Sequence, residues 1–191
     1  METPMIIGLA GVARSGKDTF CEAMSEYLSS TRNFKTQRVA LADSLKEDLN
    51  TLLLEKTGIS AFTKDDGEKK LIRPLLVCYG TQIMRKINPD YWVQKIENII
   101  EFNMENNIIS IITDIRFENE LLWLSRKKAL TIFIERAGIQ PANQDELDNY
   151  LKLKSQCDRH FSWPTFSERA QDKCRSMVRK KANGILKRAT R

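Results

Sequence analysis

The feature that most constrains this chain is a glycine-rich segment set between an apolar run and an amphipathic one. Residues 5–10 are apolar, Gly11, Gly16 and Lys17 follow in the pattern G-x-x-x-x-G-K, and apolar side chains recur near helical spacing over residues 18–30. Glycines let the backbone turn its N–H groups inward, and a helix N-terminus adds its positive dipole end. The segment therefore predicts a phosphate-binding loop, and a plain glycine turn between strand and helix is the alternative.

Residues 11–19 supply the candidate nucleotide-binding groups. Lys17 can reach the β- and γ-phosphates, and a hydroxyl just after it can serve phosphate or Mg²⁺. The residue after Lys17 is Asp18 instead of the usual Ser or Thr, so we assign the hydroxyl role to Thr19. Asp18 can hold a magnesium-bound water, or it can be a first-turn acid that favours the helix dipole. The candidate cofactor-binding residues are Gly11, Ala13, Arg14, Ser15, Gly16, Lys17, Asp18 and Thr19.

The rest of the chain alternates between strand-like and helix-like segments. Strands are expected at residues 5–10, 37–42, 107–113 and 130–135, with a short one near 176–178. Helices are expected at residues 18–30, from the capping box at Ser44, and at 74–87, 91–106, 117–128 and 144–154, with 57–70 as a loop and a helix at the end. This order predicts an α/β fold with a mostly parallel five-stranded sheet and helices on both faces.

Asp114 and Arg116 follow the strongly apolar strand expected at residues 107–113. An acid at the carboxyl end of such a strand is placed to organise Mg²⁺ in P-loop proteins. Asp114 can equally cap the helix expected at residues 117–128, and the two roles are compatible. Arg116 can pair with phosphate, or with Glu120 one helical turn further on.

Two further segments suggest a second ligand-binding wall. Lys46 is expected in the first turn of a helix, where a cation opposes the dipole, so it is either an anion ligand or a solvated lysine. Gly80 is expected inside a helix, which suggests close approach by a ligand or another backbone. Tyr91 or Trp92 can stack on a base, although a core position is the commoner fate of one such ring.

Composition limits the remaining possibilities. The 191 residues are expected to form one domain, and 41% hydrophobic and 29% charged residues argue against bulk disorder. No apolar run is long enough to span a membrane, and residues 1–4 show no signal-peptide core, so a cytoplasmic protein is expected. The four cysteines form no C-x-x-C pair and fit reduced thiols. His160 is the single histidine and is expected at the surface or as a cap, and Trp163 is expected to be a packing residue.

Charge is concentrated toward the end of the chain. Residues 151–191 hold 12 of the 31 Lys and Arg residues but only 3 of the 25 acidic ones. Such a tail can bind phosphates or nucleic acid, or it can be a solvated helix face. A lid or basic C-terminal segment is therefore expected within residues 137–191, and the run Arg179, Lys180 and Lys181 can belong to either structure.

These motifs together resemble the deoxynucleoside monophosphate kinases of tailed bacteriophages, over about residues 5–136. The matching residues are Ile6–Ala10 leading into Gly11 and Ala13 to Thr19; Ala42, Asp43, Ser44, Leu45 and Lys46; Arg73 to Leu76; Gly80, Thr81 and Arg85; Asp90 to Val93; and Thr113 to Phe117 with Asn119 and Glu120. Relatives often carry a His-Pro-Ser-Glu-like segment further on, to which only Phe166, Ser167 and Glu168 are similar.

The resemblance implies a P-loop kinase fold and an enzyme that uses ATP and Mg²⁺ to convert a deoxynucleoside monophosphate into the diphosphate for DNA precursor supply. It is compatible with a homodimer and with a place in the host cytoplasm. It implies nucleotide substrates, no membrane, and no role for nucleic acid as the main partner. Its candidate catalytic residues are Lys17, Arg14, Arg85 and Arg116, and its metal-binding residues are Thr19, Asp18 and Asp114. Its substrate-binding residues are Asp43, Lys46, Arg73, Thr81, Arg85 and Trp92.

Three other functions stay open on the sequence. A P-loop kinase can act on a phosphomevalonate-like small molecule, and animal phosphomevalonate kinases share a Ser-Gly-Lys-Asp loop. A polynucleotide 5′-kinase would use the basic tail, and its binding would fall steeply with salt. A non-enzymatic P-loop switch would bind nucleotide without multiple turnover, although the Asn-Lys-x-Asp signature of GTPases is absent.

Overall fold

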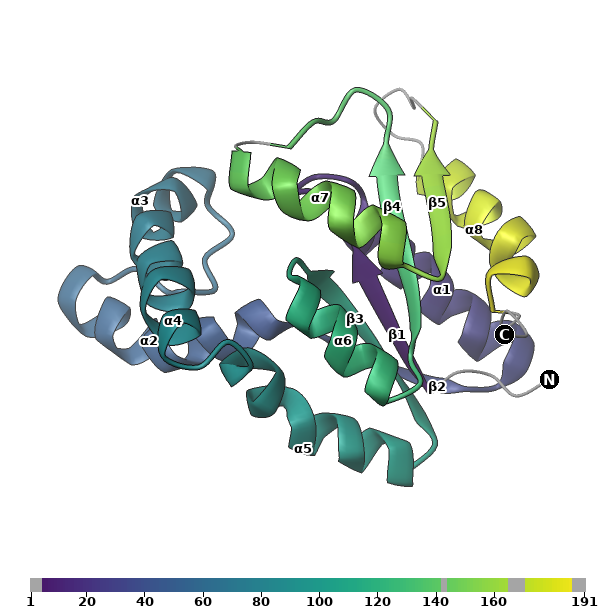
Figure 1. The fold of residues 1–191 in the computed structure, drawn as a ribbon, viewed down its shortest axis with the longest axis horizontal. Coiled ribbons are helices and arrows are strands. Elements are labelled where there is room, and N and C mark those ends of the chain that lie inside the picture. Colours follow the sequence, from purple (N-terminus) through teal and green to yellow (C-terminus); the bar gives the residue numbers. More distant parts are fainter. Residues whose placement is uncertain (1–4, 142–143, 165–170, 187–191) are drawn as a thin grey trace. The chain divides into compact units, whose positions relative to one another are not determined.

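The computed structural model describes residues 5–141, 144–164 and 171–186, and its chain forms two compact units (Figure 1). The first unit takes in Met1–Val39 and Ile99–Arg191, as far as they are described, and the second is Ala40–Asn98. The second unit is therefore one continuous segment that interrupts the first in sequence. The expected segment 166–168 lies outside the described residues.

The first unit contains a five-stranded sheet in the order β2-β3-β1-β4-β5, and all neighbouring strands are parallel. The strands are β1 (Ile6–Ala10), β2 (Lys35–Val39), β3 (Ile108–Ile115), β4 (Leu130–Arg136) and β5 (Arg159–Trp163). All five residues of β1 are buried at the centre of the sheet, as its continuous apolar run requires. The predicted α/β class with a five-stranded parallel sheet is confirmed.

The fifth strand is not where the sequence suggested. Residues 176–178 lie inside helix α8 (Gln171–Leu186), where apolar side chains recur at helical spacing. β5 instead has an alternating pattern in which Phe161 and Trp163 are buried and His160 and Ser162 are exposed. This alternation is the expected signature of a short strand at a sheet edge. His160 is a surface residue of β5, as predicted.

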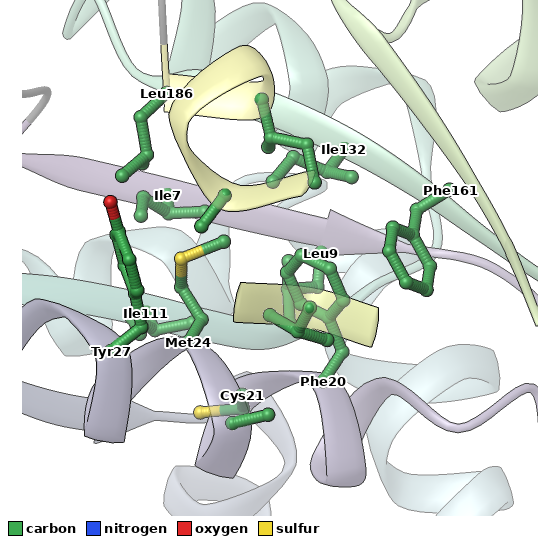
Figure 2. Packing of buried hydrophobic residues seen from close by; sticks show 14 of the residues in the cluster. Ile7, Leu9, Phe20, Cys21, Met24, Tyr27, Ile111, Ile132, Phe161 and Leu186 are labelled. Atoms are coloured by element: carbon green, nitrogen blue, oxygen red, sulfur yellow. The ribbon is translucent and has the colours of Figure 1, made fainter. Parts of the chain in front are cut away.

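Helices cover both faces of the sheet. α1 (Lys17–Arg32) and α8 pack on one face, where a single buried cluster joins Phe20, Met24 and Leu186 to Ile7 and Leu9 of β1 (Figure 2). α6 (Glu118–Arg126) and α7 (Gln144–Gln156) cover the other face, and Figure 1 shows them in front of the strands. The outer side of α8 is solvated, because Arg179, Lys180 and Lys181 are all exposed.

The second unit is helical. It contains α2 (Leu41–Thr57), α3 (Asp66–Val77), the π-helix η1 (Cys78–Met84), α4 (Arg85–Ile87) and the start of α5 (Tyr91–Glu105). Leu49, Leu53, Ala61 and Ile72 form its buried cluster. This small hydrophobic core holds the helices of the second unit together.

Three expected boundaries in the second unit are wrong. α2 begins at Leu41 with Ala40 as its N-cap, so the capping-box pattern at Ser44 lies inside the helix. The expected loop at 57–70 contains the start of α3, whose N-cap Asp65 accepts the Glu68 amide at 2.9 Å. Pro74 consequently lies within α3 and does not begin a helix.

Candidate active site

The loop between β1 and α1 has the backbone that its glycines predict. Gly11 and Gly16 have φ angles of 138° and 87°, and Arg14 is also left-handed at 63°. A Cβ on Gly11 would overlap the carbonyl oxygen of Ile134, and one on Gly16 would lie 2.6 Å from Nε1 of Trp163. Both positions therefore need glycine for conformation and for space. Trp163 packs against the loop, as the expectation of a packing residue requires.

Lys17 folds back over this loop. It is only 8% exposed, and its Nζ donates to the carbonyl oxygens of Gly11 and Val12 at 2.8 and 2.7 Å. A buried ammonium is stable only when it is hydrogen-bonded, and these carbonyls supply that stabilisation in the free chain. The positive charge is thereby held at the loop, where a bound triphosphate would add charge-assisted bonds.

A buried hydroxyl in the same loop favours an anionic ligand. Ser15 is fully buried, and its Oγ has no hydrogen-bond partner among the residues that the structure describes. This oxygen lies 3.0 Å from the position that a Cβ on Gly11 would take, which places it inside the loop. An unsatisfied buried donor is costly, and a phosphate oxygen would remove that cost. The loop is thus a suitable cradle for phosphate.

The residues around Lys17 differ in exposure. Arg14 is exposed, and Ala13 and Thr19 are half-buried. Asp18 lies in the first turn of α1, 78% exposed, with its Oδ1 3.7 Å from Nε of Arg38 in β2. An exposed pair at this distance contributes little to stability. Asp18 therefore lies where a negative charge favours the dipole of α1, and its carboxylate is also accessible to a ligand.

A bulge shapes the end of β3. Leu9 of β1 stands opposite two residues of β3, Thr113 and Asp114, and the next register pair joins Ile115 to Ala10. Bulges commonly re-aim side chains beside active sites. Asp114 is half-buried at the level of the last residue before the phosphate loop. This is where a carboxylate that serves the loop should lie.

Asp114 is not the cap of α6. That helix begins at Glu118 with Phe117 as its N-cap, three residues beyond Asp114. Glu120 is completely buried, and its Oε2 accepts the amide hydrogens of Arg116 and Phe117 at 2.7 and 3.0 Å. Glu120 therefore fixes the turn between the strand and α6. This contact of Glu120 with Arg116 is made to the backbone amide of Arg116. Arg116 itself is exposed.

Glu135 is a residue near the loop that the sequence did not single out. It lies near the carboxyl end of β4, the neighbour of β1, and accepts hydrogen bonds from Tyr150 and, at 2.6 Å, from Lys154. Burial by itself would raise the pKa of Glu135, but the hydrogen bonds from Lys154 and Tyr150 lower it below its usual value. The i,i+4 spacing of Tyr150 and Lys154 on α7 was the available signal.

The remaining candidate residues lie in the second unit. Asp43 and Lys46 form an ion pair at 3.1 Å within α2, and Lys46 lies 5.3 Å from the ring centre of Phe62. Lys46 is the sixth residue of α2, so the expected conflict with the helix dipole does not arise. The pair leaves both side chains about 30% exposed, and therefore accessible.

Gly80 and Trp92 are in direct contact within the second unit. Trp92 is 2% exposed, and its Nε1 donates to the Gly80 carbonyl at 3.0 Å. A Cβ on Gly80 would lie 2.9 Å from Cδ2 of Leu45 in α2. A close approach at Gly80 was predicted for a ligand or another backbone, but the atoms nearest to it belong to the Leu45 side chain. Trp92 has the buried position of a core aromatic, and its contact with substrate stays a prediction.

Arg73, Thr81 and Arg85 occupy successive helical segments, α3, η1 and the first position of α4. Arg73 and Thr81 are exposed, and Arg85 is half-buried. Short π-helical segments occur often at functional sites, and η1 carries Thr81. The loop residues, Asp114 and Arg116 belong to the first unit, whereas Asp43, Lys46, Arg73, Thr81, Arg85 and Trp92 belong to the second.

The cysteines and the membrane expectation can also be compared with the structure. All four cysteines are free thiols, and burial raises the pKa of Cys21 to about 11 and that of Cys157 to about 12. Within the described ranges no three His, Cys, Asp or Glu side chains gather into a metal site. None of the described helices combines the length and hydropathy needed to cross a membrane.

Comparison with protein families gives one match. Residues 52–151 match the family described as deoxynucleotide monophosphate kinase, which is more than half of the 191-residue chain. The matched residues begin after the phosphate loop, so the loop and the family match are independent indications of a nucleotide-binding protein. Comparison with curated proteins gives no match.

The chain is also similar to solved structures at low identity. Dephospho-CoA kinase from Campylobacter jejuni is 12% identical with a TM-score of 0.49, over 94% of this chain and 98% of that one. Kti12 from Chaetomium thermophilum, solved in complex with ADP-AlF3, is 11% identical with a TM-score of 0.41, over 96% of this chain and 100% of that one. Both TM-scores are below 0.5, and the fold assignment therefore rests on the sheet order and the phosphate loop.

Proposed function

Because the chain belongs to the deoxynucleotide monophosphate kinase family, we propose that it transfers the γ-phosphoryl group of ATP to a deoxynucleoside monophosphate, giving ADP and the deoxynucleoside diphosphate. The observation that carries the proposal is the phosphate loop, with Lys17 folded over it and the buried hydroxyl of Ser15 inside it. A phosphotransferase that uses ATP needs such a cradle. The family match alone would not supply it, since the match begins at residue 52.

The chemistry asks for positioning and charge stabilisation more than for proton transfer. A monophosphate is already an anion at neutral pH and can attack without a general base. Lys17 would neutralise charge that develops on the transferred phosphoryl group. On the resemblance, Arg14, Arg85 and Arg116 are the proposed cations that bridge donor and acceptor.

Magnesium fits the oxygen donors beside the loop. In phosphoryl-transfer sites Mg²⁺ binds one or two side-chain oxygens together with phosphate oxygens and water. Asp114 and Thr19 would hold it directly, and exposed Asp18 would do so through water. When bound, the ion would neutralise charge on the β- and γ-phosphates.

The second unit is proposed to bind the acceptor nucleotide. Lys46, Arg73 and Arg85 are its candidate phosphate ligands, with Asp43 holding Lys46 in place. Thr81 is exposed in η1, directly after Gly80. Trp92 would support Thr81 by holding the Gly80 carbonyl, in addition to any contact with the base.

Several wider expectations accompany this function. The enzyme would supply DNA precursors in the cytoplasm, of a host cell if the chain is phage-encoded, with small nucleotides and not nucleic acid as its partners. A homodimer and a lid within residues 137–191 are proposed on the resemblance. In that segment β5 pairs with β4 and α8 packs against α1, so neither is proposed as the lid.

A coupled assay of ADP release against all common NMPs and dNMPs tests the proposal. We expect turnover with at least one dNMP and none with phosphomevalonate or a DNA 5′ end. Turnover restricted to another acceptor would replace dNMP by that acceptor. Nucleotide binding without multiple turnover on any substrate would indicate a P-loop switch.

A further inference from the structure

Thr113 carries a buried hydroxyl that the fold itself does not use. The residue is 2% exposed, and its Oγ1 has no hydrogen-bond partner within the part of the chain that the structure describes. Thr131 on β4 shows the usual arrangement. Its hydroxyl donates to Oδ2 of Asp158 at 2.7 Å and accepts the Asp158 amide at 3.0 Å. An unsatisfied buried hydroxyl costs free energy, so its retention calls for a partner other than the residues that the structure describes.

The bulge places this hydroxyl on the nucleotide side of the sheet. Ile111 lies in the buried cluster with α1, and Ile115 lies on the opposite face, 3.6 Å from the position that a Cβ on Gly8 would take beside α6. Strand residues alternate between faces, so only an extra residue between Ile111 and Ile115 permits this change. Thr113 and Asp114 therefore share the α1 side, where the phosphate loop begins its helix.

We propose that Thr113 is a further binding residue of the nucleotide site, whose hydroxyl hydrogen-bonds to an oxygen of the bound triphosphate or to a water in the shell of its Mg²⁺. The inference rests on the proposed function, because it takes ATP as the ligand of the loop. It adds to Asp114 a neutral neighbour on the same bulge. Without ligand the described residues leave this hydroxyl unsatisfied, and the ligand satisfies it, so the contact contributes to binding and not to folding.

Three variants test the proposal. Thr113→Val keeps the shape of the side chain and removes the hydroxyl, Thr113→Ser keeps the hydroxyl, and Thr131→Val removes a satisfied hydroxyl from the neighbouring strand. The melting temperature of the ligand-free protein and the Kd for ATP by calorimetry are measured for each, with Mg²⁺ and with EDTA. Neither measurement depends on turnover.

We expect Thr113→Val to melt at or above the wild-type temperature and to bind MgATP about fivefold to tenfold more weakly, the effect of one lost hydrogen bond. Thr113→Ser should bind within about twofold of wild type. Thr131→Val should melt about 2–8 °C lower with an unchanged Kd. Weaker binding only with Mg²⁺ assigns the contact to a metal-bound water, and weaker binding under both conditions assigns it to phosphate.

A Thr113→Val protein that melts lower and binds MgATP as the wild type does would overturn the inference, because the hydroxyl would then have a structural partner. That result leaves the proposed function intact if the wild type phosphorylates a dNMP. A wild-type protein whose MgATP binding depends on Thr113 but which phosphorylates no dNMP refutes the proposed function alone. A wild type that binds no ATP refutes both.

Discussion

Replacing Glu120 by Gln should lower the free energy of unfolding far more than the same change at its exposed neighbour Glu118. The Glu120 carboxylate is fully buried and accepts the Arg116 and Phe117 amides. A hydrogen bond to a charged group contributes about 1.5–3 kcal/mol and a neutral one about 0.5–1.5 kcal/mol, so losing the charge costs about 1 kcal/mol for each bond. The new amide group adds buried donors, at about 1 kcal/mol or more.

The expected loss for Glu120→Gln is therefore about 3 kcal/mol in the free energy of unfolding, or a melting temperature lower by about 6–12 °C for a chain of this size. Glu118 carries the same charge in the same turn, and its side chain is 46% exposed with a 3.9 Å pair to Lys152. Glu118→Gln should lose less than about 1 kcal/mol.

Urea unfolding at neutral pH, followed by circular dichroism, measures both variants beside the wild type. The turn that Glu120 holds begins two residues after Asp114, so kcat should also fall in Glu120→Gln and not in Glu118→Gln. Equal stability losses in the two variants would show that the buried carboxylate does not fix the turn.

Three further outcomes can be measured by steady-state kinetics. Lys17→Met should keep its fold by circular dichroism and lower kcat by roughly 100-fold or more, the effect of one lost electrostatic contact, and near-normal turnover would remove Lys17 from the site. Asp114→Asn should raise the Mg²⁺ concentration that gives half-maximal rate, whereas unchanged Mg²⁺ dependence and kcat would end its assignment to the metal. Arg85→Ala should raise KM for the dNMP by roughly 10- to 100-fold and spare KM for ATP, and unchanged parameters would place Arg85 outside the site.

The loop and the central strands could be predicted because their signals are local. An apolar run, the glycines around Arg14 and the start of α1 are contiguous, and the loop backbone follows from them. β5 was missed because its five residues alternate polar and aromatic side chains beside a stronger helical pattern. The π-helix η1 was missed because no 3.6-residue periodicity predicts it, and its residues were expected to continue one α-helix over residues 74–87. Pro74 also favoured a helix start that the structure does not have.

The site was predictable only in part, for the same reason. Lys17 and Asp114 were found from the segments beside them. The role of Glu120 depends on its carboxylate folding back to two amides, and that of Thr113 depends on a bulge set by pairing with β1. Sequence periodicity predicts neither the hydrogen bonds of Glu120 nor the bulge at Thr113, so both roles required the structure.

The packing of Trp163 on Gly16 bears on how the chain matures during synthesis. The loop leaves the ribosome almost 150 residues before the indole that supports it. At a translation rate of 5–20 residues per second, that interval is roughly 7–30 s. For part of this time β3 and β4, the two strands that pair with β1 in the sheet, have not yet been synthesised. A nascent chain should therefore gain nucleotide affinity in one late step, when β5 has joined the sheet.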